Sequence, residues 1–471
     1  MNIHFGTGGW RAEIGKDFCM DNVRLIAAGL LKMMKKHKRT GKPVVIGYDR
    51  RFLSDSAAVW LAEVLCAGGI KVLMVHRSAP TPLIMHTVQK MGLDYGLEVT
   101  ASHNPPVYNG VKLIVKEGRD ASVEVTDELE SCIAAITEAP KTKNFEQCLS
   151  EGIAEYIKNP FNGFLDDILA VLDTAAIRER GLRILFDPMH GSATYPLMTI
   201  FYTTRCTVDI IHSNKDAYFG GHMPAPEEDT LGELAKRVVD GGYDLGIGVD
   251  GDGDRLGIID SNGEYITANE ILVLLYYYLH EYKGWKGPVV RNLATTHMLD
   301  AIAEDFGETA YEVPVGFKYI SSKIDEADAV LGGESSGGLT VRGHIHGKDS
   351  VYAASLFVEM ICKTGRTPSA MLKKLRKKYG NFVMVEDNVR FDPDRKDSLI
   401  NIIYKNKSIP EFAAGIKSVS YLDGCKIYFE SGGFVICRFS GTEPLLRIFA
   451  ESDNADTARS FIAAWKEFLK L

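Results

Sequence analysis

Three α/β domains followed by a C-terminal α+β domain are predicted by the length of the chain and by its hydrophobic patterns. The chain has 471 residues, more than one hydrophobic core accommodates, so several domains are expected. Up to about residue 375, short apolar runs typical of strands alternate with amphipathic helical runs. This alternation is typical of βαβ units with mostly parallel mixed sheets. After Gly380, short strands precede a closing helix, which indicates a separate α+β domain.

The elements of the first predicted domain, residues 1–154, follow from runs with helical spacing and from short continuous apolar runs. Helices are expected at 23–34 and 57–66, and strands at 43–48, 71–75 and 96–100. This order gives a sheet with helices between its strands. Because ligands of open α/β sheets collect at the carboxyl ends of strands, the loops that follow these strands are the first place to look for a site.

The other three predicted domains cover residues 155–261, 262–378 and 379–471. The second is expected to contain strands at 182–187 and 243–249, and the third strands at 288–291 and 329–331. The last is expected to contain strands at 418–421, 426–429 and 433–439 and a helix at 455–469. Each domain has the usual size of about 100 residues.

Composition excludes several classes of protein. The formal net charge of −8 disfavours nucleic-acid binding. The longest apolar run, residues 271–279, is about half the length of a membrane span, and the first residues lack the features of a signal peptide. The eight cysteines show no CxxC spacing and are expected to be reduced thiols of a cytoplasmic protein. Nothing in the sequence selects between a monomer and a dimer.

An acidic loop, Asp250-Gly-Asp-Gly-Asp-Arg255, follows the strand that is predicted to end at Val249. Its three carboxylates alternate with glycines and can turn toward one hard cation. An EF-hand would need Gly at loop position six and Glu at position twelve, where this chain has Arg255 and Ser261. A solvated acidic turn is the alternative, but three carboxylates this close repel one another unless something neutralises them. The loop therefore predicts a magnesium site.

A serine loop, Thr100-Ala-Ser-His-Asn-Pro-Pro106, follows the strand expected at 96–100. It presents the hydroxyl of Ser102 on a turn that the two prolines make stiff. Taken alone, this loop also fits an Asn-Pro turn with a capping serine. The residues therefore leave both a catalytic and a structural interpretation open.

Two further loops offer groups that bind sugars and phosphates. Gly332-Gly-Glu-Ser-Ser-Gly-Gly338 carries a carboxylate and hydroxyls, although taken alone it is an ordinary Gly/Ser loop. In Arg438-Phe-Ser-Gly-Thr-Glu-Pro-Leu-Leu-Arg447, two arginines flank a Ser-Gly-Thr turn whose hydroxyls and N–H groups can hold a phosphate. The chain also opens with a glycine-rich segment that ends in Arg11.

Two other motif matches fail in their context. Gly246-Ile-Gly-Val-Asp-Gly251 satisfies GxGxxG but leads into acidic residues and another strand, so it does not indicate dinucleotide binding. Gly333-Glu-Ser-Ser-Gly337 satisfies GxSxG, but that hydrolase fold needs an acid and then a histidine downstream. No Asp or Glu lies between Ser335 and the last histidine, His346, so a serine hydrolase is excluded.

Five motifs in one order along the whole chain resemble those of the α-D-phosphohexomutase family. Thr100-Ala-Ser-His-Asn-Pro105 resembles its phosphoserine loop and Asp250-Gly-Asp-Gly-Asp254 its magnesium loop. Gly333-Glu-Ser-Ser-Gly337 resembles its sugar loop and Arg438-Phe-Ser-Gly-Thr-Glu-Pro444 its phosphate loop. The opening Phe5-Gly-Thr-Gly-Gly-Trp-Arg11 is similar to its N-terminal motif. The resemblance implies four domains around one central cleft, the last with a TATA-binding-protein-like fold.

The resemblance also implies an isomerase that works through a phosphoserine. Phosphorylated Ser102 would donate its phosphoryl group to a sugar monophosphate, and the bisphosphate formed, glucose 1,6-bisphosphate for a glucose substrate, would reorient and return its other phosphate. Mg²⁺ would offset the charge in flight, which is most of what phosphoryl transfer requires. Its implied ligands are a phosphoserine oxygen at Ser102 and the carboxylates of Asp250, Asp252 and Asp254.

The resemblance implies further roles for residues in and beside these motifs. Arg11 and Arg255 would stabilise the transferring group, while His103 and Lys112 are candidates for handling the hydroxyl proton. As a base, Lys112 would need a lowered pKa. Glu334 and Ser336 would bind sugar hydroxyls. The non-reacting phosphate would be held by Arg438, Ser440, Gly441, Thr442 and Arg447.

The expected substrate is a glucose phosphate. Glu334-Ser-Ser-Gly337 resembles the glucose/mannose form of the sugar loop, and Val313-Pro-Val-Gly-Phe-Lys318 resembles a phosphoglucomutase segment. One departure is Gly338, where many relatives carry histidine, a role that His344 or His346 could take over. The alternatives are a phosphomannomutase, a dual-specificity enzyme or a phosphopentomutase. A magnesium phosphohydrolase with an aspartyl nucleophile and a silent phosphosugar-binding protein are more remote.

Overall fold

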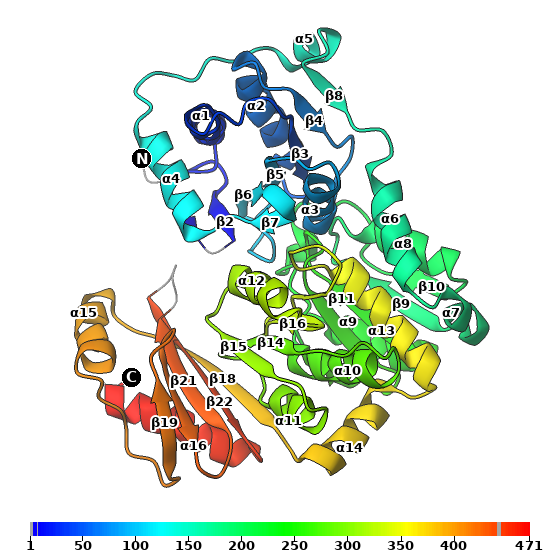
Figure 1. Ribbon diagram of the computed structural model, residues 1–471, viewed down its shortest axis with the longest axis vertical. Coiled ribbons are helices and arrows are strands. Elements are labelled where there is room, and N and C mark those ends of the chain that lie inside the picture. Colours follow the sequence, from blue (N-terminus) through cyan, green and yellow to red (C-terminus); the bar gives the residue numbers. More distant parts are fainter. Residues whose placement is uncertain (1–2, 7, 440–443) are drawn as a thin grey trace. The chain divides into compact units, whose positions relative to one another are not determined.

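The computed structural model of the chain (Figure 1) describes residues 3–6, 8–439 and 444–471. The chain divides into two compact units. The first unit consists of Met1–Ile271 and Ser336–Ser369, and the second of Leu272–Ser335 and Ala370–Leu471. Helices α10 (Ala268–Glu281) and α14 (Pro368–Tyr379) pass from the first unit to the second.

A mixed eight-stranded sheet begins the first unit, in the order β1-β2-β6-β5-β3-β4-β8 with β7 paired to β6. Strands β3, β4, β5 and β8 are parallel, whereas β1, β2, β6 and β7 pair antiparallel. The strands are β1 (Phe5–Gly6), β2 (Gly9–Glu13), β3 (Val44–Tyr48), β4 (Val72–Met74), β5 (Tyr95–Val99), β6 (Tyr108–Val115), β7 (Arg119–Asp120) and β8 (Ala154–Tyr156).

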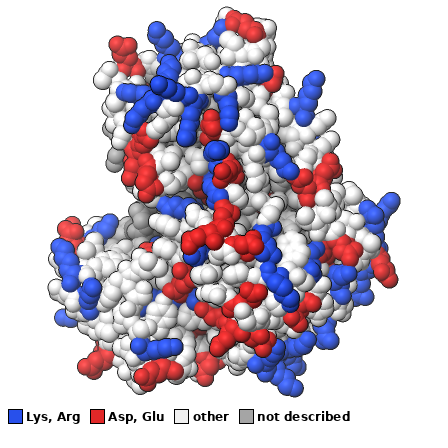
Figure 2. Space-filling view, viewed as in Figure 1, with Lys and Arg blue, Asp and Glu red and all other residues white. Residues whose placement is uncertain are grey.

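Helices cover this sheet because their apolar faces pack on its strands. Leu30 of the first helix, Leu61 of the second and Ile46 of β3 are fully buried in one cluster. The helices are α1 (Met20–Lys36), α2 (Ser54–Ala67), α3 (Thr81–Lys90), η1 (Lys116–Gly118), α4 (Val123–Ala134) and α5 (Phe145–Ser150). Basic side chains gather in the part of Figure 2 that corresponds to α1. Lys35 and Lys36 lie in the last turn of this helix, where their charge complements the helix dipole.

The first unit also contains a five-stranded sheet, whose strand order is β10-β9-β11-β12-β13. Its first three strands are parallel and its last two antiparallel. The strands are β9 (Arg183–Asp187), β10 (Thr207–Ile210), β11 (Leu245–Val249), β12 (Leu256–Asp260) and β13 (Tyr265–Ile266). The remaining elements of the unit are α6 (Pro160–Val171), α7 (Thr174–Arg180), α8 (Thr194–Thr203), η2 (Phe219–Gly221), α9 (Gly232–Gly241), β17 (Leu339–Val341) and α13 (Ser350–Thr364).

The second unit contains a parallel sheet and an antiparallel one. In the parallel sheet, β14 (Val289–Asn292) lies between β15 (Ala310–Val313) and β16 (Leu331–Gly333), with helices α11 (Met298–Asp305) and α12 (Phe317–Ala327). The antiparallel sheet has the order β18-β22-β21-β20-β19. Its elements are β18 (Val383–Arg390), η3 (Pro393–Arg395), α15 (Lys396–Ile400), η4 (Asn401–Lys405), β19 (Ile416–Ser420), β20 (Cys425–Phe429), β21 (Phe434–Phe439), β22 (Leu445–Ser452) and α16 (Ala455–Leu469).

The predicted fold class, three α/β domains and a C-terminal domain with an antiparallel sheet, is confirmed. Some details differ from the expectations above. The strand expected at 329–331 lies at Leu331–Gly333, because the Ala329 N–H still bonds the carbonyl of Ile324 in α12. Strands β18 and β22 were not predicted, and Arg447 lies within β22 rather than in the loop before it.

The structure also bears on two expectations from composition, which concern membrane spans and the cysteines. Among the described helices, none combines the length and the apolar character that a membrane span requires. All eight cysteines fall in the described part of the chain and are free thiols.

Candidate functional site

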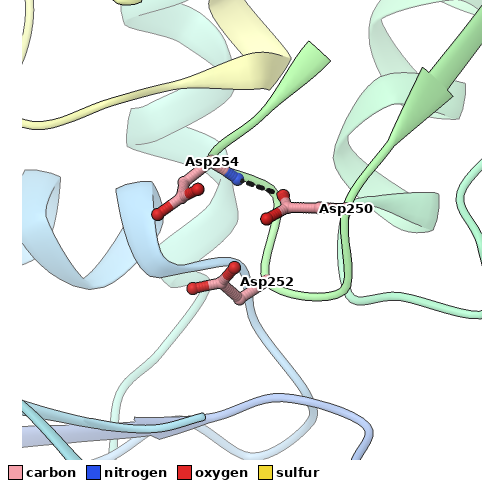
Figure 3. A group of neighbouring side chains, drawn as sticks. All are labelled: Asp250, Asp252 and Asp254. Carbon is pink, nitrogen blue, oxygen red and sulfur yellow. Dashed lines mark hydrogen bonds between the residues drawn. The ribbon is translucent and has the colours of Figure 1, made fainter. Parts of the chain in front are cut away.

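The three acidic residues of the predicted magnesium loop lie together on the turn between β11 and β12. Asp250, Asp252 and Asp254 are 0%, 0% and 2% exposed, and each offers an oxygen within 4.8 Å of the others (Figure 3). Gly253 has a φ of +73°, and a Cβ there would lie 2.7 Å from Pro80 Cβ. The alternation of aspartate and glycine therefore lets this tight loop gather three carboxylates.

The oxygens of these carboxylates fall into two groups. Oδ1 of Asp250 accepts hydrogen bonds from the N–H groups of Asp254 (2.8 Å) and Arg255 (2.9 Å). In contrast, Oδ1 of Asp252 and Oδ1 of Asp254 are buried and have no hydrogen-bond partner among the residues that the structure describes. A buried carboxylate oxygen without a partner is costly, so these two atoms point to a ligand. Hard oxygen donors in this number suit Mg²⁺, and the residues present therefore fit the ion.

Two lysines balance part of the negative charge. Lys112 Nζ lies 2.6 Å from Asp252 Oδ2 and 3.0 Å from Asp254 Oδ2, and Lys348 Nζ lies 2.9 Å from Asp254 Oδ2. Burial works against the charged form of Lys112, but the two aspartates outweigh it and raise its pKa above the ordinary value. Burial and the nearby Asp254 and Asp252 raise the pKa of Asp250 well above its usual range. The site as a whole thus still favours an additional cation.

Two helices begin at the acidic loop. Thr81, the first residue of α3, donates its N–H to the Asp252 carbonyl (2.8 Å) and its hydroxyl to Asp252 Oδ2 (2.6 Å). Ser350, the first residue of α13, donates its hydroxyl to the Gly253 carbonyl (2.7 Å). The positive ends of two helix dipoles therefore lie near the carboxylates and stabilise their charge.

Ser102 lies on the loop between β5 and β6, where it reaches the acidic loop. Its side chain is buried, and its Oγ lies 3.4 Å from Asp250 Oδ2 and 3.3 Å from His103 Nδ1. Ser102 has a φ of +52°, in the left-handed region that favours glycine. Such strain persists only where the surroundings hold it, and it is common at functional sites. The structure therefore brings Ser102 and the predicted metal ligands together across about 150 residues of sequence.

Arg11 and Arg255 share the surroundings of Ser102. Arg11 Nη1 donates to Asn104 Oδ1 (2.7 Å), and burial together with the charge of Arg255 lowers the pKa of Arg11. Burial, and after it the charges of Arg255 and Arg11, also lower the pKa of His103 well below its ordinary value. A neutral imidazole therefore lies beside the Ser102 hydroxyl, and two mutually repelling guanidinium groups suit an anion such as phosphate.

The remaining predicted residues belong to the second unit, except Ser336, which belongs to the first. Glu334 is buried, and its Oε1 accepts hydrogen bonds from Asn292 Nδ2 (3.2 Å) and from the N–H of Gly316 (3.0 Å). Gly316 is part of the segment 313–318 that the sequence singled out. The sugar loop and that segment are therefore joined through one carboxylate.

Arg438 and Arg447 are direct cross-strand partners in β21 and β22. Two like charges facing each other on antiparallel strands are destabilising unless an opposite charge lies nearby. Asp423 provides part of it, since its Oδ2 lies 3.2 Å from Arg438 Nη2. The pair is consistent with the predicted phosphate loop, whose Ser440, Gly441 and Thr442 lie outside the described residues.

Lys348 and Thr81 were not predicted. No sequence motif marks either residue, because their contacts with the acidic loop depend on the placement of α13 and α3. A Cβ at Gly338 would lie 2.1 Å from Lys348 Cδ, so the glycine leaves room for the lysine side chain that reaches Asp254. His344, considered above as a substitute at this position, is paired through Nε2 with Asp349 Oδ2 (2.7 Å).

Glu98 was also missed, although its charge in the apolar strand β5 was a usable signal. It is fully buried, and neither carboxylate oxygen has a hydrogen-bond partner in the described ranges. It is the cross-strand partner of Lys112. Burial and the charges of Asp49 and Asp252 raise the pKa of Glu98 well above its ordinary value. Glu98 is therefore a buried carboxyl group that favours its protonated, uncharged form.

The raised pKa of Glu98 predicts a pH-dependent stability. An unfolded glutamate titrates at about 4.3, so above that pH the folded chain binds a proton that the unfolded chain has lost, and stability falls as the pH rises. The melting temperatures of wild type and of Glu98→Gln are compared in protein treated with a chelator. From pH 5 to pH 8 the melting temperature of the variant should rise relative to that of wild type, because glutamine has no proton to lose. Glu98→Met serves as the matched variant and should show the same trend. A difference that stays constant with pH would contradict the assignment.

Metal binding should depend on the acidic loop. Asp254→Asn removes one charge and should weaken Mg²⁺ or Mn²⁺ binding by at least about tenfold, measured by calorimetric titration. Asp229→Asn, on an exposed acid of the same unit, is the control and should bind like wild type. Equal affinity of the Asp254 variant and the wild type would rule out this loop as the cation site.

The phosphoglucomutase/phosphomannomutase family matches the chain in four consecutive segments. They are alpha/beta/alpha domain I at residues 2–140, domain II at 162–263, domain III at 267–379 and the C-terminal domain at 399–467. The phosphoglucomutase/phosphomannomutase of Thermococcus kodakarensis is 28% identical and covers 98% of this chain and 97% of its own length. The phosphoglucosamine/phosphogalactosamine mutase of Sulfurisphaera tokodaii is 26% identical, with 100% of both chains covered.

Solved structures agree with this result. A protein of Thermus thermophilus, provisionally named a phosphomannomutase, superposes with a TM-score of 0.86 at 26% identity over 100% of both chains. Because the matches run in order through all four segments and not only through the site loops, the chain belongs to the α-D-phosphohexomutase superfamily, with the four-domain architecture of phosphoglucomutases and phosphomannomutases, and is a phosphohexomutase.

Proposed function

We propose that this phosphohexomutase interconverts glucose 1-phosphate and glucose 6-phosphate through a phosphoserine at Ser102 and a bisphosphorylated sugar. The observation that supports the proposal most is the meeting of Ser102 with the acidic loop, where Ser102 Oγ lies 3.4 Å from Asp250 Oδ2. A hydroxyl, three carboxylates and two guanidinium groups at one place are the groups that phosphoryl transfer requires.

In the first half-reaction, a sugar hydroxyl attacks the phosphorus of phosphorylated Ser102. The new O–P bond forms as the Ser102 Oγ–P bond breaks, and Arg11 and Arg255 stabilise the charge on the transferring group. The proton of the sugar hydroxyl must leave and Ser102 Oγ must gain one. His103 is suited to move this proton, because its Nδ1 lies 3.3 Å from Ser102 Oγ. The raised pKa of Lys112 favours an electrostatic role for that residue.

Asp250, Asp252 and Asp254 would hold Mg²⁺, with Ser102 contributing a phosphoryl oxygen. When bound, the ion supplies positive charge that offsets the charge of the phosphoryl group. Lys112 and Lys348 keep two of the carboxylates oriented through their Oδ2 atoms, which leaves Oδ1 of Asp252 and Oδ1 of Asp254 for the cation.

The rest of the substrate would be held by the other loops. We assign the sugar hydroxyls to Glu334 and Ser336, and the non-reacting phosphate to Arg438, Ser440, Gly441, Thr442 and Arg447. Reorientation of the bisphosphate exchanges its two ends, so the same phosphate site serves both half-reactions. The domain limits 1–154, 155–261, 262–378 and 379–471, and a cytoplasmic location, are part of this proposal.

The preference for glucose rests on the form of the sugar loop, Glu334-Ser-Ser-Gly337, and on the segment 313–318 that contacts Glu334 through Gly316. The names of the relatives given above include phosphomannomutase and phosphoglucosamine mutase. Mannose phosphate and glucosamine phosphate are therefore the main alternatives to a glucose phosphate as substrate. A pentose phosphate is the third.

A coupled assay with glucose, mannose, glucosamine and ribose 1-phosphates tests the substrate. With Mg²⁺ and a catalytic amount of glucose 1,6-bisphosphate, kcat/KM should be highest for the glucose compound, by at least about tenfold. A glucose rate no better than the others would overturn this choice while leaving the mutase chemistry in place.

Ser102→Ala tests the mechanism. Intact mass spectrometry should find a phosphate-sized adduct on wild type, removable by phosphatase and mapped to Ser102, and none on the variant. Activity should fall at least about 1,000-fold, because the covalent route is lost. Phosphate on an aspartate together with an active Ser102→Ala variant would establish a phosphohydrolase instead. If the wild-type protein shows no turnover under these conditions, it is a phosphosugar-binding protein without catalytic activity.

A further inference from the structure

Arg51 is a buried arginine whose guanidinium grips the backbone of the phosphoserine loop. It lies just beyond β3 and is 1% exposed. Its Nη2 donates to the carbonyls of Ser102 (2.6 Å) and Asn104 (2.6 Å), and its Nη1 donates to those of Pro105 (3.0 Å) and Tyr108 (3.0 Å). Three carbonyl groups of the phosphoserine loop, and that of Tyr108 at the start of β6, therefore converge on a single side chain.

The guanidinium itself is fixed from the other side. Its Nε lies 3.3 Å from Asp49 Oδ2, and Asp49 Oδ1 accepts hydrogen bonds from the Arg51 N–H (2.9 Å) and the Ser54 hydroxyl (2.7 Å). The Asp49 N–H in turn bonds the carbonyl of Val99 at the end of β5 (3.0 Å). Arg51 is thus tied to the strands that lead into the loop.

Arg51 also faces the loop that carries the carboxylates. Its guanidinium lies 4.9 Å from the ring centroid of Phe219. A Cβ at Gly251 would lie 3.5 Å from the Phe219 ring and 3.2 Å from the Ser102 carbonyl oxygen that Arg51 binds. The same carbonyl oxygen is therefore held by Arg51 and packed against the acidic loop.

These contacts bear on the strained conformation of Ser102. With a φ of +52°, the residue needs surroundings that over-determine it, and the bond to its carbonyl is a direct restraint. We propose that Arg51 is a positioning residue for phosphoryl transfer, which holds Ser102 in its left-handed conformation and in register with Asp250. This inference rests on the proposed role of Ser102 as the phosphorylated residue.

No other type of side chain offers the same set of hydrogen-bond donors. The planar guanidinium offers five N–H donors in a fixed fork, whereas an ammonium has three donors and a methionine has none. Arg51→Lys therefore keeps the charge beside Asp49 but loses part of the grip on the loop, and Arg51→Met loses all of it. The neighbouring Arg50 provides a matched control, because it is half-buried and donates to the Ser213 carbonyl (2.8 Å) rather than to the phosphoserine loop.

The experiment compares Arg51→Lys, Arg51→Met and Arg50→Met with wild type. For Arg51→Met, kcat should fall about 100-fold, the loss typical of a misplaced reacting group, while KM stays within about threefold. Arg51→Lys should lie in between, and Arg50→Met within about twofold of wild type. The rate at which glucose 1,6-bisphosphate phosphorylates Ser102, followed by intact mass, should fall in parallel with kcat.

Hydrogen exchange separates positioning from a general loss of stability, and Arg51→Lys keeps the test open if Arg51→Met does not fold. Amides of Ser102, Asn104 and Tyr108 should exchange faster in Arg51→Lys, while those of β3 and β5 remain as in wild type. Unchanged phosphorylation of Ser102, or faster exchange throughout the sheet, would overturn the inference. If wild type carries no phosphate on Ser102, the proposed function fails first, and the two failures are distinguished.

Discussion

The burial of three carboxylates on one short loop is the constraint on which the site depends. Asp250, Asp252 and Asp254 are almost completely removed from water, and such a cluster is unfavourable without compensating charge. Lysines from β6 and from the turn before α13, and the N-termini of α3 and α13, converge on it from distant parts of the sequence. Several elements of the first unit therefore help to offset the charge of this loop, and the cluster is consistent with a site for a divalent cation.

Backbone strain at Ser102 and buried polar side chains occur together near the acidic loop. Ser102 adopts a left-handed conformation, Glu98 is buried without a hydrogen-bond partner in the described chain, and Arg51 directs its guanidinium at carbonyl groups. The backbone conformation of Ser102 and the unpartnered carboxyl group of Glu98 oppose stability, whereas Arg51 is held by the carbonyl groups that it binds. Local features that oppose stability and occur together are expected at functional sites rather than elsewhere.

A second regularity is the placement of like charges. The charge of Arg255 contributes to the lowered pKa of Arg11 near Ser102, and Arg438 faces Arg447 across two strands of the second unit. Like charges repel in both pairs, and each pair has the chemistry that suits an anion.

The sequence by itself determined the fold class and the order of the site loops, because alternating apolar runs and short motifs are local properties of the chain. Residue type and spacing also predicted a cation site at the three aspartates, whereas the role of Ser102 was implied only by the resemblance to a known family. Only the tertiary structure decided which charges meet: Lys112 and Lys348 with the aspartates, Arg51 with the serine loop, and Arg438 with Arg447. These pairs depend on strand register and on contacts between residues that are far apart in the chain, and no local pattern encodes them.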